Sequence, residues 1–255
     1  MATLQNKTAL VTGASRGIGR ATASALANSG AHVLVHYGRS TLDAESLVAD
    51  IRSKGGRADS ISADLGNPNG ATQLAKEVRS IVGERLDILV SNAGISKSAT
   101  FRDHTVKDLD NLFATNVRSP FFLIQQLLPV LAEGSNIIVI SSLGAREVVG
   151  KPGLENRSLL AYSATKGALE TLVKNWAAML GPQGIRVNAV APGVIDTDMS
   201  NFAKTDEGRQ ATLGMQALKR IGKPEDVADV VAFLASEGAR WITGASIPVD
   251  GGSKL

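Results

Sequence analysis

Hydrophobic and polar positions divide the chain into two kinds of segment. Short apolar runs, several of them rich in β-branched residues, predict strands over residues 8–12, 32–37, 59–63, 86–91, 136–141, 185–190 and 246–249. Longer stretches with apolar residues at helical spacing predict helices over residues 18–29, 42–54, 71–82, 106–132, 162–180 and 224–235. Runs that are apolar throughout, such as Ile137–Ile140, are typical of parallel strands covered on both faces.

Strands and helices alternate from end to end, without repeats, low-complexity segments or a linker. This alternation predicts an α/β fold, a doubly wound parallel sheet with helices on both faces, in which residues 1–255 form one dinucleotide-binding and catalytic domain. In open sheets of this kind, ligands bind beyond the carboxyl ends of the strands. We therefore expect the catalytic and ligand-binding residues at those ends.

Composition mainly excludes functions. The chain is 44% hydrophobic and 20% charged, with a net charge of +3, which is ordinary for a soluble globular protein. It contains no Cys, which excludes disulfides and thiol nucleophiles. Basic and acidic residues are interspersed, so we expect no nucleic-acid partner. His32, His36 and His104 are dispersed, so we expect no metal site.

The chain also lacks an obvious targeting signal. No apolar run approaches the length of a membrane span, and residues 1–7 are polar. We therefore expect a cytoplasmic protein without a membrane partner. Ser253–Leu255 matches a peroxisomal signal, which would be meaningful only in a eukaryotic cell.

A glycine-rich turn follows the first predicted strand and opens the first predicted helix. Its spacing, Gly-x-x-x-Gly-x-Gly, lets the backbone approach a pyrophosphate, and the helix N-terminus offers free N–H groups and a positive dipole end. Glycines also serve ordinary strand-to-helix corners, but the context here favours a dinucleotide site. The candidate cofactor-binding residues of this turn are Gly13, Ser15, Arg16, Gly17, Ile18 and Gly19.

The end of the second predicted strand indicates which dinucleotide is bound. An NAD site usually has an acidic residue here, yet the segment is His36, Tyr37, Gly38, Arg39 and Ser40, and the first acid is Asp43. Arg39 and Ser40 can bind a 2′-phosphate, and Arg16 can add a second positive charge. The alternative is that Arg39 is a solvated loop residue. The segment favours NADP(H) over NAD(H), with His36 and Tyr37 also placed beside the cofactor.

The motifs together resemble those of the short-chain dehydrogenase/reductase family in order and approximate spacing. The matching residues are Thr12–Gly19, Asn92–Gly94, Asn116, Ser142, Tyr162–Lys166 and Pro192–Gly193. The resemblance covers essentially the whole chain. It implies a Rossmann fold with a seven-stranded parallel sheet, a homotetramer, and reversible hydride transfer between NAD(P)(H) and a carbonyl or alcohol.

The resemblance also assigns the catalytic residues Asn116, Ser142, Tyr162 and Lys166. Tyr162 and Lys166 are four residues apart, so both side chains lie on one helix face. We expect the Lys166 ammonium to lower the pKa of the Tyr162 phenol, which then acts as general acid or base. The family uses a serine like Ser142 to orient the carbonyl oxygen, and an asparagine like Asn116 at a helix irregularity in a proton relay. Ser141 is expected only to cap its strand.

Other strand ends complete the implied cofactor site. Asp64 would reach the adenine amino group beside Leu65, and Asn92, Ala93 and Gly94 would line the adenosine side. After the sixth strand, Ile195 and Thr197 would hold the nicotinamide carboxamide. The remaining residues that the resemblance assigns to the cofactor are Tyr162, Lys166, Pro192 and Gly193.

Two segments depart from the family pattern or vary within it. Ser142 and Tyr162 are twenty positions apart, which is about seven more than the usual spacing. We therefore predict substrate loops at about residues 143–161 and 194–216. Phe202, Leu213 and Met215 in the second loop suit an apolar or bulky carbonyl compound.

The sequence thus predicts an NADPH-dependent carbonyl reductase that acts on a small molecule. One alternative is a 3-oxoacyl-[acyl-carrier-protein] reductase, but the places where that type carries carrier-binding basic residues are here Ala132–Ser135 and Ala177–Ala178. A second alternative is a non-catalytic NADP(H) sensor, which typically loses the Tyr or Lys that this chain keeps. The resemblance implies tetramer contacts through helices 106–132 and 162–180.

Overall fold

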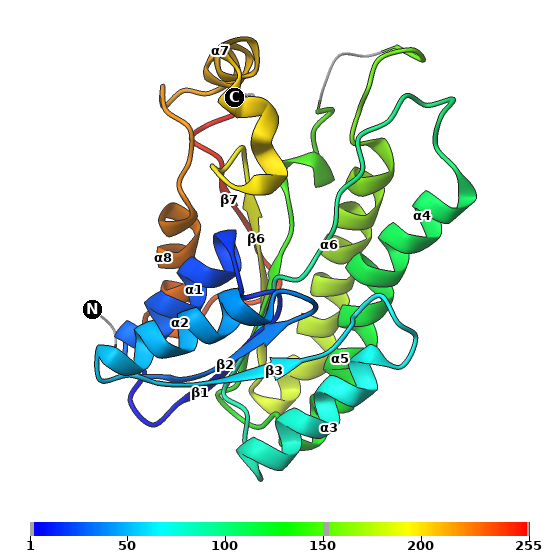
Figure 1. The fold of residues 1–255 in the computed structure, drawn as a ribbon. Helices are drawn as coiled ribbons and strands as arrows, with labels where there is room; N and C mark the ends of the chain where they lie inside the picture. The colour runs from blue at the N-terminus through cyan, green and yellow to red at the C-terminus, as the bar shows by residue number, and fades with distance from the viewer. Residues whose placement is uncertain (1–2, 150–152, 254) are drawn as a thin grey trace.

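The centre of the molecule is a sheet of seven parallel strands, so the predicted fold class is confirmed. The computed structural model describes residues 3–149, 153–253 and 255 (Figure 1). Within them the strand order is β3-β2-β1-β4-β5-β6-β7. The strands are β1 (Thr8–Val11), β2 (His32–Tyr37), β3 (Arg57–Ser62), β4 (Ile88–Ser91), β5 (Asn136–Ile140), β6 (Arg186–Pro192) and β7 (Ser246–Val249).

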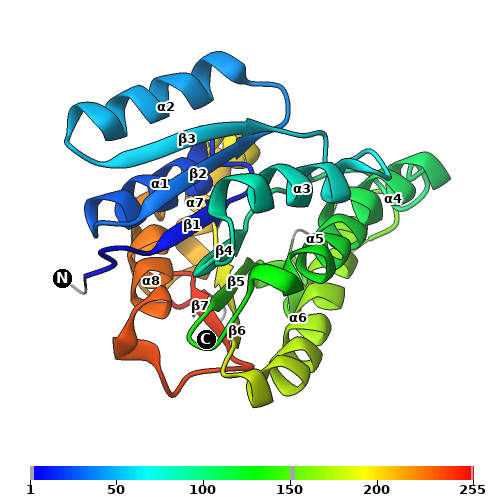
Figure 2. The same cartoon turned by 90° about the horizontal axis from the view of Figure 1, so that it is seen from below.

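Helices cover both faces of the sheet, as Figure 2 shows. One apolar core lies under α1, α2 and α8, and the second lies under α3, α5 and α6. The helices are α1 (Gly17–Asn28), α2 (Thr41–Ser53), α3 (Gly70–Val82), α4 (Val106–Phe113), α5 (Ser119–Leu127), α6 (Leu160–Leu180), α7 (Asp206–Met215) and α8 (Pro224–Ala235). In the described part of the chain, no helix is long and apolar enough to cross a membrane.

The strand order reverses beside β1. From β1 the chain builds β2 and β3 on one side, and then crosses to add β4 on the other. Connections on opposite sides of such a switch leave a crevice at the carboxyl ends of the two central strands. The turn after β1 and residues 92–94 after β4 both border this crevice.

Two predicted segments differ from the structure. The helix predicted over residues 106–132 is divided into α4, a π-helical turn at Ala114–Arg118, α5 and a 3₁₀ turn at Leu128–Val130. The loop predicted at 194–216 contains a 3₁₀ segment at Asp198–Lys204 and the helix α7. Thr205 is the N-cap of α7, because its hydroxyl accepts a hydrogen bond from the Gly208 N–H.

Some expectations lie outside the described residues. These are residues 150–152 of the predicted loop 143–161, and Lys254 of the C-terminal tripeptide.

Candidate active site

The turn between β1 and α1 packs too closely for side chains at two of its glycines. Gly13 has φ +63°, and a Cβ there would lie 2.9 Å from Ala93 Cα. A Cβ on Gly19 would lie 2.3 Å from the Gly13 oxygen and 2.5 Å from Asn92 Nδ2. Asn92 Nδ2 also donates to the Thr12 and Gly13 oxygens at 2.8 and 3.0 Å. The turn is therefore built on the end of β4 as well as on β1.

His36 supports the same turn from β2. Its Nδ1 accepts a hydrogen bond from the Gly13 N–H at 3.0 Å, so Nε2 carries the proton and donates to the Ala63 oxygen at 3.0 Å. The side chain is only 2% exposed. Burial, opposed in part by the bond to Ala63, lowers the pKa of His36 to about 4. At neutral pH the imidazole is therefore uncharged. It supports the turn through its hydrogen bonds and supplies no positive charge.

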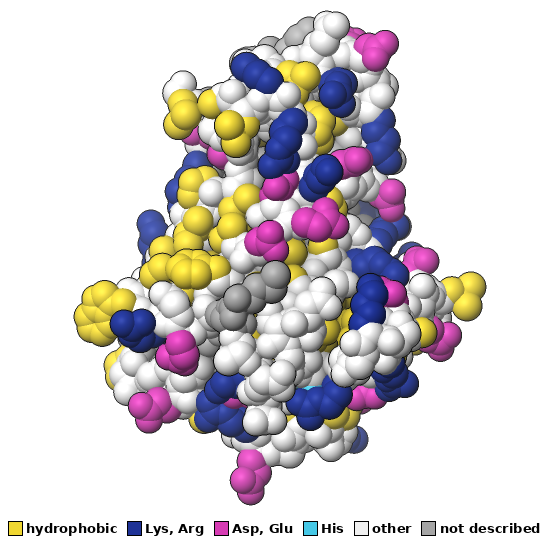
Figure 3. Space-filling model, turned by 90° about the vertical axis from the view of Figure 1, so that its left-hand side faces the viewer, with side chains coloured by type: hydrophobic (Ala, Val, Ile, Leu, Met, Phe, Trp, Pro, Cys, Tyr) yellow, Lys and Arg dark blue, Asp and Glu magenta, His cyan; other side chains and the backbone are white. Residues whose placement is uncertain are grey.

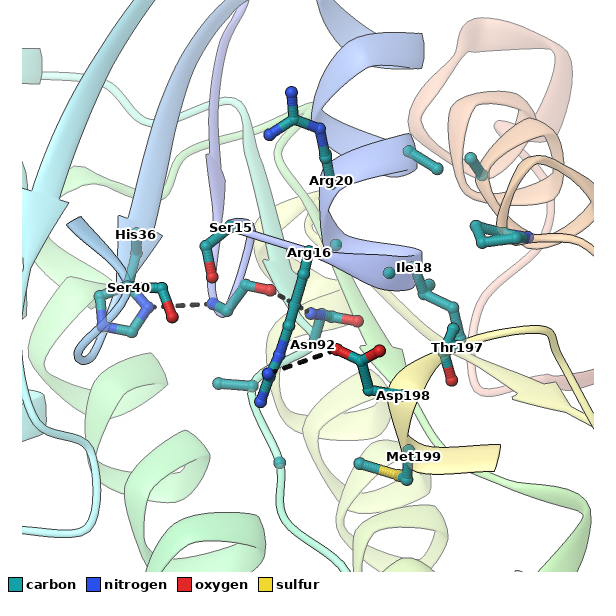
Figure 4. Close-up of a pocket in the computed structure, with 18 of the residues that line it drawn as sticks. Ser15, Arg16, Ile18, Arg20, His36, Ser40, Asn92, Thr197, Asp198 and Met199 are labelled. Carbon is teal, nitrogen blue, oxygen red and sulfur yellow. Dashed lines mark hydrogen bonds and ion pairs between the residues drawn. The ribbon is translucent and has the colours of Figure 1, made fainter. Parts of the chain in front are cut away.

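The first turn of α1 remains open to a ligand. Its N-cap residue, Arg16, makes no capping hydrogen bond with its side chain. The Arg16 guanidinium instead pairs with Asp198 at 3.4 Å, across the pocket (Figure 4), and both side chains are largely exposed. Arg39 is exposed as well and, among the described residues, has no ion-pair partner. Uncapped N–H groups with two nearby guanidiniums form an environment suited to phosphate groups.

A cavity of about 1780 Å³ covers these strand ends and continues along the groove between α1 and α8. It is larger than a typical pocket for one small ligand, which is about 300–1,000 Å³. The predicted cofactor residues that line it are Gly13, Ser15, Arg16, Gly17, Ile18, Gly19, His36, Arg39, Ser40, Asp64, Leu65, Asn92, Ala93, Gly94 and Thr197.

The remaining predicted cofactor residues do not line this cavity. Tyr37 is half-buried and packs against the core under α1 and α8, so the structure does not bring it to the expected phosphate side. Ile195 is 3% exposed and belongs to the same core. Pro192 ends β6, and the Gly193 N–H donates to the Val249 oxygen, so these two residues shape the backbone. Tyr162 and Lys166 are buried and do not line this cavity either.

Three of the four residues expected to be catalytic, Ser142, Tyr162 and Lys166, come together at the end of β5. Tyr162 and Lys166 lie in the first two turns of α6, and Lys166 Nζ is 5.5 Å from the centroid of the Tyr162 ring. The Ser142 side chain lies close enough to the Tyr162 hydroxyl to oppose the rise in its pKa. Ser142 directly follows β5, and its Oγ also accepts from the Gly144 N–H at 3.1 Å. Tyr162 and Lys166, four residues apart, thus lie on one face of α6, as expected.

The expected effect of Lys166 on the Tyr162 pKa is wrong for this structure. Burial raises the pKa of Tyr162, and the hydrogen bond with Ser142 only partly opposes that rise. Lys166 Nζ donates to the Ile140 oxygen at 2.7 Å and lies over the ring rather than at the hydroxyl. Burial also lowers the pKa of Lys166 to about 8. The phenol therefore holds its proton at neutral pH.

Asn116 lies in the π-helical turn, which confirms the irregularity implied for this position. Its side chain is 1% exposed, with Oδ1 accepting from the Ile95 N–H and Nδ2 donating to the Ile95 oxygen, both at 2.9 Å. Nδ2 also donates to Thr165 Oγ1 at 3.0 Å. Asn116 thereby ties the segment after β4 to α6, one residue before Lys166.

Several contacts around the site join segments that no sequence motif connects. Residues 98–101 pair with residues 154–158, with reciprocal hydrogen bonds between Ala99 and Ser158 at 3.2 and 2.9 Å. Arg102 and Glu155 add an ion pair at 2.7 Å. The segment after β4 is therefore held against the loop before α6. Such pairs are distant in sequence, and no local pattern predicts them.

Comparisons with known proteins agree with this geometry. A family model described as enoyl-(acyl carrier protein) reductase matches residues 13–254. The chain is 42% identical to versicolorin reductase of Emericella nidulans, over 98% of this chain and 96% of that one. It is 40% identical to a 3-oxoacyl-[acyl-carrier-protein] reductase of Staphylococcus epidermidis, over 97% and 98%. A short-chain dehydrogenase from Burkholderia cenocepacia, solved with NADP, superposes with a TM-score of 0.92 at 38% identity, covering 99% of both chains.

A glycine turn at the switch point and a Ser-Tyr-Lys group with a buried tyrosine and lysine define an oxidoreductase of the Rossmann type. The chain belongs to the short-chain dehydrogenase/reductase family, as its motifs imply.

The low pKa of the buried His36 side chain predicts how the stability of the protein depends on pH. Its folded pKa, about 4, lies below the ordinary histidine value of 6.5. Between these values the unfolded chain binds a proton that the folded protein excludes, so stability falls as the pH drops from 6.5 towards 4. The loss is about 3 kcal/mol in total.

The variant His36→Asn keeps an acceptor for the Gly13 N–H but does not titrate. Urea unfolding between pH 7.5 and 4.5 should show a shallower loss of stability for the variant than for the wild type. An equally steep loss of stability in the variant and the wild type would show that the folded protein does not hold His36 neutral.

Proposed function

We propose that this chain is an NADPH-dependent carbonyl reductase, and that its 255 residues work as one unit. The observation that carries the proposal is the grouping of Ser142, Tyr162 and Lys166 at the carboxyl end of β5, where Ser142 acts on the Tyr162 phenol and Lys166 Nζ lies over its ring. When bound, NADPH supplies the hydride that reaches the carbonyl carbon. The chain supplies the proton and holds the carbonyl oxygen.

Each polar group has a distinct part in this reaction. Tyr162 donates its proton to the carbonyl oxygen as negative charge develops there, and the raised pKa keeps that proton available. Ser142 donates a hydrogen bond to the same oxygen and stabilises the charge. Lys166, which is positively charged below its pKa of about 8, would favour the phenolate left on Tyr162 only if its ammonium moved from the Ile140 oxygen towards the hydroxyl. Asn116 anchors α6 through Thr165.

The residues present fit an NADP(H) cofactor. The close packing at Gly13 and Gly19 and the uncapped start of α1 would accommodate a pyrophosphate. Arg39 and Ser40 would hold the 2′-phosphate, and no acidic side chain precedes Asp43 at this strand end. Arg16 joins them only if it leaves Asp198. The Burkholderia relative, solved with NADP, supports this assignment.

The predicted loops 143–161 and 194–216 would form the substrate entrance. Exposed apolar side chains in and beside them suit an apolar carbonyl compound: Phe101, Val148, Leu154, Met199 and Phe202. Reduction of 3-oxoacyl groups on acyl carrier protein is a second candidate, favoured by the 40% identity with the Staphylococcus enzyme. The missing basic residues at 132–135 and 177–178 disfavour it. A non-catalytic sensor is disfavoured by the intact Tyr162 and Lys166.

We also propose a homotetramer with two different self-complementary faces. On one face Phe121 and Phe122 of α5 are exposed, and Phe121 packs on Trp176 of α6 at 6.2 Å between ring centroids. On the other side, Phe233 of α8 and Trp241 are 47% and 97% exposed. Figure 3 shows an apolar band among interspersed charges on that side.

Light scattering should therefore give a mass near four times 26.5 kDa. Phe121→Asp should reduce the assembly to dimers, because it places a charge in a face that the proposal buries. Ile81→Asp, at an exposed position of α3, is the matched control and should leave the tetramer intact. A monomeric wild type would refute the assembly.

The catalytic assignment is tested by Tyr162→Phe. With free ketones and aldehydes, and with a carrier-bound 3-oxoacyl substrate, kcat should fall by about 10²–10⁴-fold because the general acid is lost. The dissociation constant for NADPH, read from its fluorescence, should stay within about twofold. Tyr37→Phe is the same change at the only other tyrosine and should leave kcat unchanged.

Three results of that experiment are informative. Full activity in Tyr162→Phe would refute its role. Turnover of the carrier-bound substrate alone would favour the second candidate function. Tight NADPH binding by a wild type that reduces no substrate would favour the sensor.

The cofactor assignment is tested by Arg39→Ala. Loss of one charged hydrogen bond to the 2′-phosphate should raise the KM for NADPH by about tenfold, while the KM for NADH changes little. Arg57→Ala removes the same charge at the opposite end of the neighbouring strand β3 and is the control. Equal effects of Arg39→Ala on both cofactors would contradict the phosphate role.

A further inference from the structure

Glu170 is a buried carboxylate that the proposed reaction does not use. Its side chain is 10% exposed and accepts three hydrogen bonds. Oε1 accepts from the Ser141 hydroxyl at 3.1 Å and from the Ser246 hydroxyl at 2.6 Å, and Oε2 accepts from Arg146 Nε at 2.6 Å. A buried charge is costly unless it is paired, so this site needs an explanation beyond stability.

The position of Glu170 on α6 relates it to the catalytic group. Residues 162, 166 and 170 are each four apart, so Tyr162, Lys166 and Glu170 lie on one face of the same helix, a turn apart. All three are buried. Helix α6, which carries Tyr162 and the Lys166 ammonium, therefore also carries the Glu170 carboxylate.

The partners of Glu170 flank the turn that holds Ser142. Ser141 directly precedes Ser142, and Arg146 follows the 3₁₀ turn Leu143–Ala145. Ser142 is extended, with φ −164° and ψ 152°, so its side chain and that of Ser141 point in opposite directions. Ser141 thus binds the carboxylate instead of only capping its strand, while Ser142 meets Tyr162.

We propose that Glu170 is a positioning residue: by binding Ser141 and Arg146 it fixes both ends of the 141–146 turn, so that the Ser142 hydroxyl meets the Tyr162 hydroxyl. Ser246, the first residue of β7, holds the carboxylate itself against the sheet. The inference rests on the proposed function. Small displacements of catalytic groups are costly, since a shift of about 1 Å can lower a rate about 10²-fold.

The test is Glu170→Gln, assayed with the ketone that the wild type reduces best. The amide keeps the size of the side chain and can accept from the serines, but it loses the charge that binds Arg146. We expect kcat to fall by about 10–100-fold, with NADPH affinity within about twofold. Arg146→Ala should lower kcat similarly, and Arg146→Lys should restore part of it. The double variant should be no worse than either single variant.

A second readout does not depend on turnover. The chain has two tyrosines, so ¹³Cζ labelling of tyrosine gives two NMR signals, and Tyr162→Phe identifies that of Tyr162. This signal should move in Glu170→Gln and in Arg146→Ala, because the hydrogen bond with Ser142 changes. Glu84→Gln makes the same chemical change at an exposed residue and should leave kcat and the signal unaltered.

The outcomes separate this inference from the proposed function. If the wild type reduces no carbonyl compound, the proposed function fails, whereas a moved Tyr162 signal would still show that Glu170 positions Ser142. If the wild type is active, and Glu170→Gln keeps kcat within twofold with the signal unmoved, the inference is overturned. Arg146→Ala, at a half-exposed partner, decides the question if Glu170→Gln does not fold.

Discussion

The reversal of strand order beside β1 is the constraint on which the rest of the site depends. It places the ends of β1 and β4 side by side with a crevice above them. The backbone there is so crowded that a Cβ at Gly19 would lie 2.3 Å from the Gly13 oxygen. His36 and Asn92 complete the arrangement by bonding to the turn from neighbouring strands. This packing brings the uncapped start of α1 to the crevice.

Local patterns predicted the fold because each strand and helix carries its own signal. Strands β2 and β7 have the predicted bounds, and a turn residue follows each of them, Gly38 after β2 and Asp250 after β7. The predicted helix 106–132 is interrupted at Asn116, because the asparagine side chain bonds to Ile95 and Thr165 in other segments. Helix α7 was missed because its sequence is mostly polar, and a polar stretch without apolar periodicity predicts a loop.

The site was predictable in its residues but not in its contacts. Glycine spacing and the Tyr162–Lys166 interval are read directly from the chain, whereas Arg16 and Asp198 are 182 positions apart. Glu170 offered one usable signal, since an acidic residue four positions after Lys166 falls on the buried helix face. Its partners Ser141 and Ser246 lie 29 and 76 positions away, so only the folded sheet brings them together.

The protonation of Tyr162 shows why position matters more than residue type at this site. A lysine four residues away was expected to lower the phenol pKa, yet burial acts on the hydroxyl itself and raises it, while the ammonium is held by the Ile140 oxygen. In this state Ser142 alone lowers the pKa of Tyr162. In the proposed reaction the serine would therefore tune the proton donor as well as face the substrate. Whatever holds the Ser142 turn in place would then control both binding of the carbonyl oxygen and delivery of the proton to it.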